Sequence, residues 1–428
     1  MEEIISFILE YIRNNLPHVI FGLLTLYQVF YLITGVFSKK KSYPETNIFK
    51  KYAVVIAARN EEAVIGKLIE SINKQTYDKD KIQVFVVADN CSDNTAKIAR
   101  AHGAIVYERF NEEKKRKGWA LQYLFDNINK DYDILSFDGY IFFDADNLVD
   151  KNFIHEINKA FVVNKNIVVS YRNVKNFDTN FISSAYGIHF FRSVVSYHRP
   201  RERFNLGTHV AGTGYVVSAH LIKDGWNFHS LTEDTELTLH FSTKGVKIGF
   251  CEDAVFYDEQ PIDFATAYRQ RLRWTAGRAY VFIKYLPSMI FNMFRKLSFN
   301  LYDMFFYSFP YAFYSLAKFI FIPMLVAVIT GNFLTGNFWY EWLIIFVTFM
   351  SSVYLGSVFF ASLVVIRERK NIKANQGTII KAVITFPWFE MINILLAFGV
   401  LINPKIKWST IAHTDQRTID EIDKSGKN

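Results

Sequence analysis

Three stretches of the chain share one pattern and decide the fold: residues 53–62 read AVVIAARNEE, residues 82–90 read IQVFVVADN, and residues 140–146 read YIFFDAD. Each is an apolar run that ends in charged or amide side chains. A strand needs such a continuous run when helices cover both faces of its sheet. Helical patterns follow the runs at 63–72, 94–101 and 119–128. This alternation predicts an α/β domain with a mostly parallel sheet flanked by helices.

The polar ends of the three runs form the first candidate site. They are Arg59-Asn60-Glu61, Asp89-Asn90 and Asp144-Ala145-Asp146. A single aspartate at a strand end is ordinarily a turn or helix-cap residue. In open α/β sheets, however, ligands bind beyond the carboxyl ends of the strands. Three clusters at equivalent ends therefore predict one shared binding crevice.

Asp144 and Asp146 lie two positions apart after a buried run, a spacing that lets two carboxylates share a hard divalent cation. Mg²⁺ or Mn²⁺ would take their oxygens and keep coordination positions for a diphosphate. Lys117 ends the basic run at 114–117, which reads KKRK and precedes a helical pattern. Such a run either places positive charge beside phosphate or is a solvated loop.

Thr232-Glu233-Asp234 precedes a helical pattern at 235–241. Thr232 is a candidate N-cap, and acidic residues are favourable in the first turn of a helix. The functional alternative is that one of the two carboxylates is a general base, which accepts the proton of an attacking sugar hydroxyl.

The composition indicates a folded domain joined to membrane segments. Of the 428 residues, 50% are hydrophobic and 21% charged, which excludes a disordered chain or a collagen. Apolar blocks cover residues 18–37, 305–329, 339–366 and 379–402. We therefore predict an uncleaved helix before a cytoplasmic domain and three helices after it, in a multi-pass protein of the cell membrane. The net charge of +8 is interpreted as cytoplasmic flanks that face anionic lipid headgroups, with no nucleic-acid partner.

Two features complicate the late apolar segments. Pro387 and Glu390 fall inside the last block, so we expect that block to be broken and re-entrant or partly interfacial. The tail carries Lys405 and Lys407, whose side of the membrane conflicts with three helices after the domain. Residues 264–294 interleave arginines with aromatic residues, which predicts a helix at the membrane surface or an ordinary amphipathic core helix.

In this order, the motifs resemble those of the membrane-embedded family-2 glycosyltransferases, such as cellulose, hyaluronan, chitin and poly-N-acetylglucosamine synthases. The resemblance rests on the segments 57–62, 86–90, 117–118, 144–146, 232–234 and Gln270-Arg271-Leu272-Arg273-Trp274. The T-E-D and Q-x-x-R-W elements are specific in combination, whereas the others are individually common. One departure is Val216-Val217, where several of these synthases carry arginine.

The resemblance implies a GT-A fold that binds a UDP-sugar with Mg²⁺ or Mn²⁺ and inverts the anomeric centre by direct displacement. It implies these roles: nucleotide-sugar binding by Ala57, Glu61, Asp89, Lys117, Asp144, Gln270 and Arg273, metal binding by Asp144 and Asp146, catalysis by Asp234 and Glu233, and acceptor binding by Trp274.

The predicted parts are a membrane anchor at 1–42, a GT-A domain at 43–260, interfacial helices at 261–297, membrane helices at 298–403 and a polar tail at 404–428. The expected function is transfer of a hexose or N-acetylhexosamine from a UDP-sugar to a growing polysaccharide. One alternative is transfer of a single sugar to a membrane lipid. The other is a membrane scaffold that keeps the fold without chemistry.

Overall fold

The computed structural model describes residues 6, 24–163, 166–329, 338–404, 406, 413 and 415–425. Three sequence predictions lie partly or wholly outside these residues: the start of the first apolar block at 18–23, the external link at 330–337, and the tail lysines Lys405 and Lys407.

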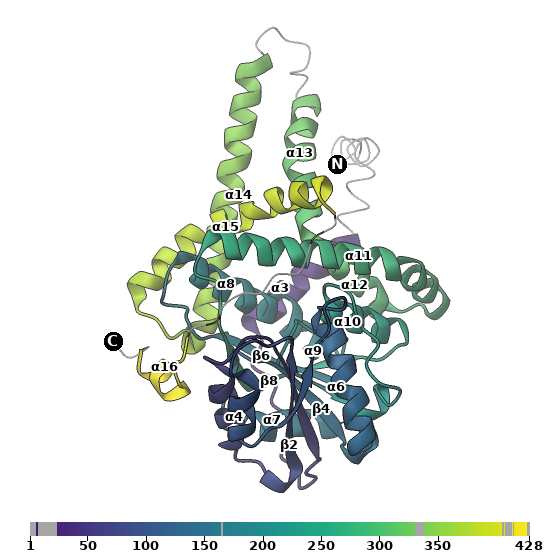
Figure 1. Ribbon diagram of the computed structural model, residues 1–428. Helices are drawn as coiled ribbons and strands as arrows, with labels where there is room; N and C mark the ends of the chain where they lie inside the picture. The colour runs from purple at the N-terminus through teal and green to yellow at the C-terminus, as the bar shows by residue number, and fades with distance from the viewer. Residues whose placement is uncertain are drawn as a thin grey trace.

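An eight-stranded sheet carries the part of the chain between residues 52 and 258, in the order β3-β2-β1-β4-β7-β6-β8-β5 (Figure 1). The strands are β1 (Tyr52–Ala58), β2 (Ile82–Asp89), β3 (Ile105–Arg109), β4 (Gly139–Asp144), β5 (Leu148–Val149), β6 (Ile167–Val174), β7 (Tyr215–Ser218) and β8 (Ile248–Asp258). The neighbours β3, β2, β1 and β4 are parallel, as predicted. Because β7 runs antiparallel to β4 and β6, and β5 antiparallel to β8, the sheet as a whole is mixed.

Alternate residues of β1 enter two different cores, which explains its uninterrupted apolar sequence. Val54 and Ile56 pack with the helices α4 (Ile65–Asn73) and α7 (Phe153–Val162). Ala53 and Val55 lie in a second core, which includes residues of α6 (Lys117–Asp131), α8 (Phe181–Ser193) and α10 (Glu233–Thr243). Burial on both faces is the condition under which a strand needs no polar alternation.

The long helix α11 (Phe264–Lys296) covers the top of the sheet domain and continues through Pro287 (Figure 1). Its inner side buries Ala267, Val281 and Phe282, whereas Ile283 and Phe294 are each 68% exposed. A helix whose outer side keeps large apolar residues exposed is suited to a lipid surface. The predicted amphipathic segment at 264–294 is thus one continuous helix.

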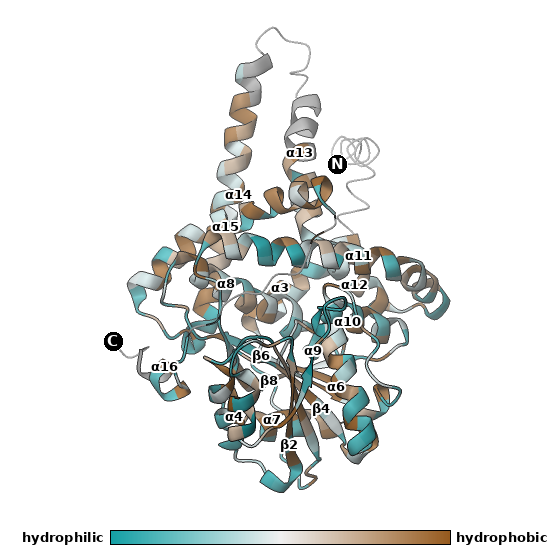
Figure 2. Ribbon diagram, viewed as in Figure 1, coloured by the Kyte–Doolittle hydropathy of each residue, from teal (hydrophilic) through white to brown (hydrophobic). Residues whose placement is uncertain are grey.

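Four further helices follow: α12 (Phe299–Ser308), α13 (Tyr311–Ile329), α14 (Phe338–Glu368) and α15 (Gln376–Ile402). Figure 1 shows α13 and α14 side by side, extending away from the sheet, and Figure 2 shows apolar residues along α14. Among the described residues, the helices over 343–371 and 376–402 are long and apolar enough to cross a bilayer. The apolar block predicted at 305–329 is divided, because α12 ends two residues before Pro310.

The expectation that Pro387 breaks the last block is wrong. The helix α15 runs through it and lies across the base of α13 and α14 (Figure 1). Phe386 and Phe389 on either side of the proline are buried, and Glu390 pairs with Arg192 of α8 at 2.7 Å. These tertiary contacts outweigh the local preference of proline to end a helix.

The apolar helix α3 (Tyr27–Phe37) meets the sheet domain at Gly35. A Cβ atom added at Gly35 would lie 1.6 Å from the carbonyl oxygen of Val195, in the π-helical turn that follows α8. Gly35→Ala should therefore lower the free energy of unfolding by about 1–3 kcal/mol, because the two backbones must separate.

The matched control is Gly356→Ala on α14, where the described residues place no atom outside the adjacent helix backbone within 4 Å of the added Cβ. Its unfolding midpoint should equal or exceed that of the parent, since alanine favours a helix. Thermal unfolding of the detergent-purified chains would show the difference. Equal midpoints for the two variants would contradict the close contact.

Candidate active site

One cavity of about 1300 Å³ lies beyond the carboxyl ends of β1, β2 and β4 and continues to α13 and α14. Every residue predicted for the site lines it: Ala57, Glu61, Asp89, Lys117, Asp144, Asp146, Glu233, Asp234, Gln270, Arg273 and Trp274. The strand ends thus converge on one crevice, as the topology predicts. The individual roles stay predictions.

Lys117 lies at the centre of the acidic end. Its Nζ contacts Asp144 Oδ1 at 2.5 Å and lies 3.7 Å from Glu233 Oε1. Burial lowers the pKa of Lys117, but the two carboxylates raise it by more, so the ammonium stays charged. Gly118 lets α6 begin here, because a Cβ atom would lie 2.1 Å from the carbonyl oxygen of Phe228. A steric constraint therefore explains why glycine follows Lys117 in the sequence.

Glu233 and Asp234 begin α10 beside this lysine. Burial, together with the charge of Asp234, raises the pKa of Glu233 to about 7, and Lys117 limits the rise. Thr232 occupies the N-cap position, as the capping alternative requires, but its hydroxyl makes no hydrogen bond to the helix. Its side chain instead packs against Gly277 of α11, where a Cβ atom would lie 2.5 Å from the methyl carbon. Asp234 Oδ1 accepts a bond from the Thr235 amide at 2.7 Å.

Hydrogen bonds fix Asp144 through its backbone amide and Asp146 through its carboxylate. Thr213 Oγ1 contacts the Asp144 amide at 2.9 Å, and Asp146 Oδ2 accepts a bond from the Glu259 amide at 3.3 Å. Burial raises the pKa of Asp146. The described residues contain no group of three or more metal-binding side chains. The carboxylate oxygens of Asp144 and Asp146 could supply part of the coordination shell of Mg²⁺ or Mn²⁺. A donor diphosphate and water would complete that shell.

Asp89, at the end of β2, is fixed by an arginine that the sequence reasoning did not single out. Arg109 Nη1 donates to Asp89 Oδ1 at 2.5 Å, and Arg109 Nη2 donates to the carbonyl of Lys114 at 2.8 Å. Burial raises the pKa of Asp89, although Arg109 opposes the rise. The pair joins β2 and β3 to the basic run before α6.

His413 is the residue of the tail that the sequence reasoning did not place in the site. Its Nδ1 lies 3.0 Å from Glu61 Oε1, and its Nε2 lies 3.9 Å from Asp146 Oδ2. Burial lowers the pKa of His413, but Asp146 and Glu61 raise it by more, to about 10. Arg417 holds the following segment by donating to the carbonyl of Lys175 at 3.1 Å. No spacing in the sequence links residue 413 to the strand ends.

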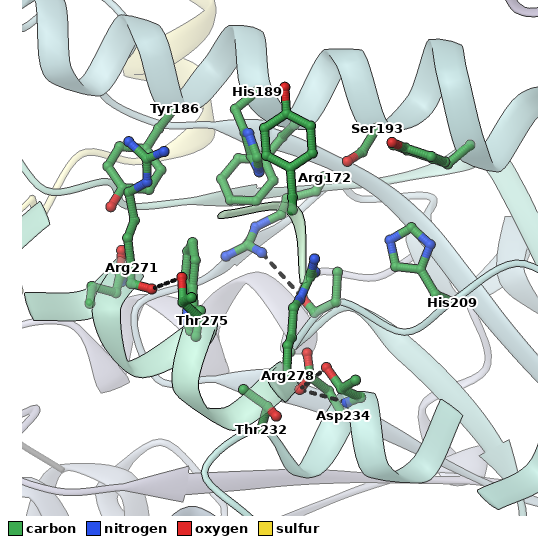
Figure 3. A pocket seen from close by; sticks show the side chains of 18 of the residues that line it. Arg172, Tyr186, His189, Ser193, His209, Thr232, Asp234, Arg271, Thr275 and Arg278 are labelled. Carbon is green, nitrogen blue, oxygen red and sulfur yellow. Dashed lines mark hydrogen bonds between the residues drawn. The ribbon is translucent and has the colours of Figure 1, made fainter. Parts of the chain in front are cut away.

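The helix α11 supplies the opposite wall. Arg273 Nη1 donates to the carbonyl of Leu231 at 3.1 Å, which ties α11 to the loop before α10. Trp274 lies edge-on to Tyr186, with ring centres 6.1 Å apart. Gln270 Oε1 is buried and has no hydrogen-bond partner in the described part of the chain. Figure 3 shows Asp234 on this side of the cavity together with Arg278, further along α11.

The chain belongs to the glycosyltransferase-like family 2, whose model matches residues 50–277.

Two curated relatives are similar over part of the chain. A probable glycosyltransferase of Bacillus subtilis is 28% identical over 275 residues, or 61% of this chain and 62% of the relative. A β-monoglucosyldiacylglycerol synthase of Synechocystis is 24% identical over 235 residues, or 54% of this chain and 48% of the relative. The chain thus spans between about half and three fifths of these relatives.

A solved mannosyltransferase from Pyrobaculum calidifontis, in complex with GDP-Man and Mn²⁺, has a similar fold. Its TM-score is 0.54 at 15% identity, over 93% of this chain and 99% of that chain. This likeness establishes the GT-A fold and nothing about the substrate.

Asp146→Ala should weaken metal-dependent nucleotide binding by at least about tenfold, because half of a two-carboxylate site is lost. Calorimetric titration of UDP in Mn²⁺, and again in a chelator, measures the effect. The matched control is Asp126→Ala, an exposed aspartate of α6 outside the cavity. Unchanged binding by the Asp146 variant would rule out a cation site at this position.

Proposed function

We propose that this enzyme transfers one hexose or N-acetylhexosamine from a UDP-sugar to a hydroxyl group of a membrane lipid. One observation carries the proposal. The cavity that contains Asp144 and Lys117 also reaches Tyr314 of α13 and Val353 and Phe360 of α14. A polar donor and an apolar acceptor chain can therefore enter one cavity from its two ends.

The proposed reaction is a direct displacement. Lys117 and Arg273 would face the donor diphosphate, and a cation on Asp144 and Asp146 would neutralise charge that develops on the leaving group. The acceptor oxygen attacks the anomeric carbon as the bond to the phosphate oxygen breaks. The bonding electrons leave with UDP, the hydroxyl proton passes to Asp234, and the configuration inverts.

Two features support a lipid acceptor in a membrane protein, and we further propose that it is multi-pass in the cell membrane with a cytoplasmic catalytic domain. The helix α14 exposes large apolar side chains, among them Leu355 at 65% and Phe359 at 66%. Among the relatives are proteins named for lipid substrates: β-monoglucosyldiacylglycerol synthases and a 4,4′-diaponeurosporenoate glycosyltransferase.

A second candidate is the transfer of successive sugars to a polysaccharide. The specific observation in its favour is the Q-x-x-R-W segment, whose Gln270, Arg273 and Trp274 all line the cavity. The flat face of an indole ring suits a sugar acceptor as well as a lipid headgroup. The size and solubility of the product separate the two candidates.

The purified enzyme, given vesicles of mixed membrane lipids, Mn²⁺ and a panel of radiolabelled UDP- and GDP-sugars, should place label in the chloroform-soluble fraction. The product should gain the mass of one sugar. Water-soluble label of high molecular mass would instead establish the polysaccharide reaction. Omission of the vesicles is the matched control and should abolish label in the lipid fraction.

Asp234→Asn should lower the transfer rate by about a thousandfold while UDP binding is kept, because the amide cannot accept the hydroxyl proton. The control is Asp224→Asn, an exposed residue outside the cavity. Full activity of the Asp234 variant would refute the assigned base. Absence of turnover in the parent enzyme with every donor and acceptor would favour a scaffold.

A further inference from the structure

Arg278 of α11 lines the cavity, and its guanidinium group has few protein partners among the described residues. Its Nη2 lies 3.4 Å from the hydroxyl oxygen of Tyr307, which is a long hydrogen bond. In the described part of the chain, no ion pair joins it to a carboxylate. Two other cavity arginines are fully paired: Arg192 with Glu390 at 2.7 Å, and Arg201 with Asp303 at 2.7 Å. A guanidinium carries five donors, and the hydrogen bond to Tyr307 uses one of those on Arg278, a residue that lines the cavity.

Two aromatic side chains complete the surroundings of this arginine. The His209 ring stacks on the Tyr307 ring with centres 4.0 Å apart, and both line the cavity (Figure 3 labels His209). His209 is 3% exposed, and its Nδ1 finds no hydrogen-bond partner among the residues that the structure describes. Burial, then the charges of its neighbours, including Arg278, lower the pKa of His209, so its ring is neutral. A buried polar atom left unpaired costs free energy unless a ligand satisfies it.

The cluster lies beside the proposed base. Figure 3 shows Arg278 rising from α11 next to Asp234, and the Asp234 charge acts on the guanidinium. Arg278 follows Trp274 by about one helical turn and contacts Tyr307 of α12. Lys117 contacts Asp144 at the strand ends, where the donor diphosphate is proposed to bind.

We propose that Arg278, His209 and Tyr307 bind an oxyanion, a phosphate or a carboxylate, of the lipid acceptor. The acceptor is then an acidic lipid that carries a free hydroxyl group. A guanidinium binds such an oxyanion through two parallel hydrogen bonds, which sets orientation as well as affinity. The bound oxyanion would hold a neighbouring hydroxyl beside Asp234. This inference rests on the proposed function, and it makes Arg278 a determinant of acceptor specificity.

The direct test measures binding by the full chain in detergent, with the donor site saturated by UDP and Mn²⁺. The probes are dihexanoyl phosphatidic acid, neutral dihexanoylglycerol and inorganic phosphate, titrated by calorimetry. The phosphatidic acid should bind at least about tenfold more tightly than the neutral lipid. Arg278→Gln should remove that difference, and Arg278→Lys should keep part of it.

The matched control is Arg269→Gln, an exposed arginine of the same helix outside the cavity, which should bind like the parent. UDP binding by the Arg278 variants establishes that they are folded. Equal affinity of the parent for the charged and neutral lipids would overturn the proposal. So would phosphatidic acid binding that survives Arg278→Gln, or inorganic phosphate that binds as tightly as the lipid.

A transfer assay separates this inference from the proposed function. Phosphatidylcholine vesicles would carry either phosphatidylglycerol, which is acidic and has hydroxyl groups, or neutral diacylglycerol. Faster transfer to phosphatidylglycerol that depends on Arg278 supports both claims. Equal transfer to the two lipids keeps the proposed function and overturns the oxyanion site. Binding that depends on Arg278, without transfer to any lipid, supports the oxyanion site and overturns lipid glycosylation.

Discussion

Two buried arginines on the short helix α9 (Arg199–Arg203) fix the apolar helices on the sheet domain. Arg199 bridges Glu252 of β8 at 2.5 Å and Glu368, at the end of α14, at 2.6 Å. Arg201 donates hydrogen bonds from two nitrogens to the carboxylate of Asp303 in α12, at 2.7 and 2.8 Å. A buried charge costs several kcal/mol unless it is paired and fully hydrogen-bonded. Few other orientations of these helices on the sheet domain would keep both arginines paired. The continuous cavity exists because this orientation is fixed.

That constraint gives the cavity two chemically different ends. Carboxylates collect at the sheet because parallel strands end at one edge, and their mutual repulsion is relieved by Lys117 and His413. Aromatic and aliphatic side chains collect where α13 and α14 leave the domain. The helix α11 runs along the cavity, with Arg273 bonded to the loop before α10 and Arg278 to Tyr307 of α12. A shift of this helix would change both ends together.

The sequence was sufficient where local rules and topology agree. Uninterrupted apolar runs located β1, β2 and β4, and the strand-end rule brought Glu61, Asp89 and Asp146 into one cavity. The sequence was insufficient where contacts between residues far apart in the chain determine the local structure. The strand β7 has four residues, too few for a clear period, and its antiparallel pairing makes the sheet mixed. Pro387 stays inside a helix because neighbouring aromatics pack around it, and His413 reaches the site from a tail without any motif spacing.

The central claim is that a nucleotide-sugar and a lipid meet in this one cavity. Electron cryomicroscopy of the enzyme in lipid nanodiscs, with Mn²⁺ and a non-transferable UDP-sugar analogue, tests it most directly. The diphosphate should lie between Asp144, Lys117 and Arg273, with the anomeric carbon facing Asp234 and lipid density reaching it from α13 and α14. Nucleotide density outside this cavity, or protein side chains closing the path from α14 to Asp234, would contradict the claim.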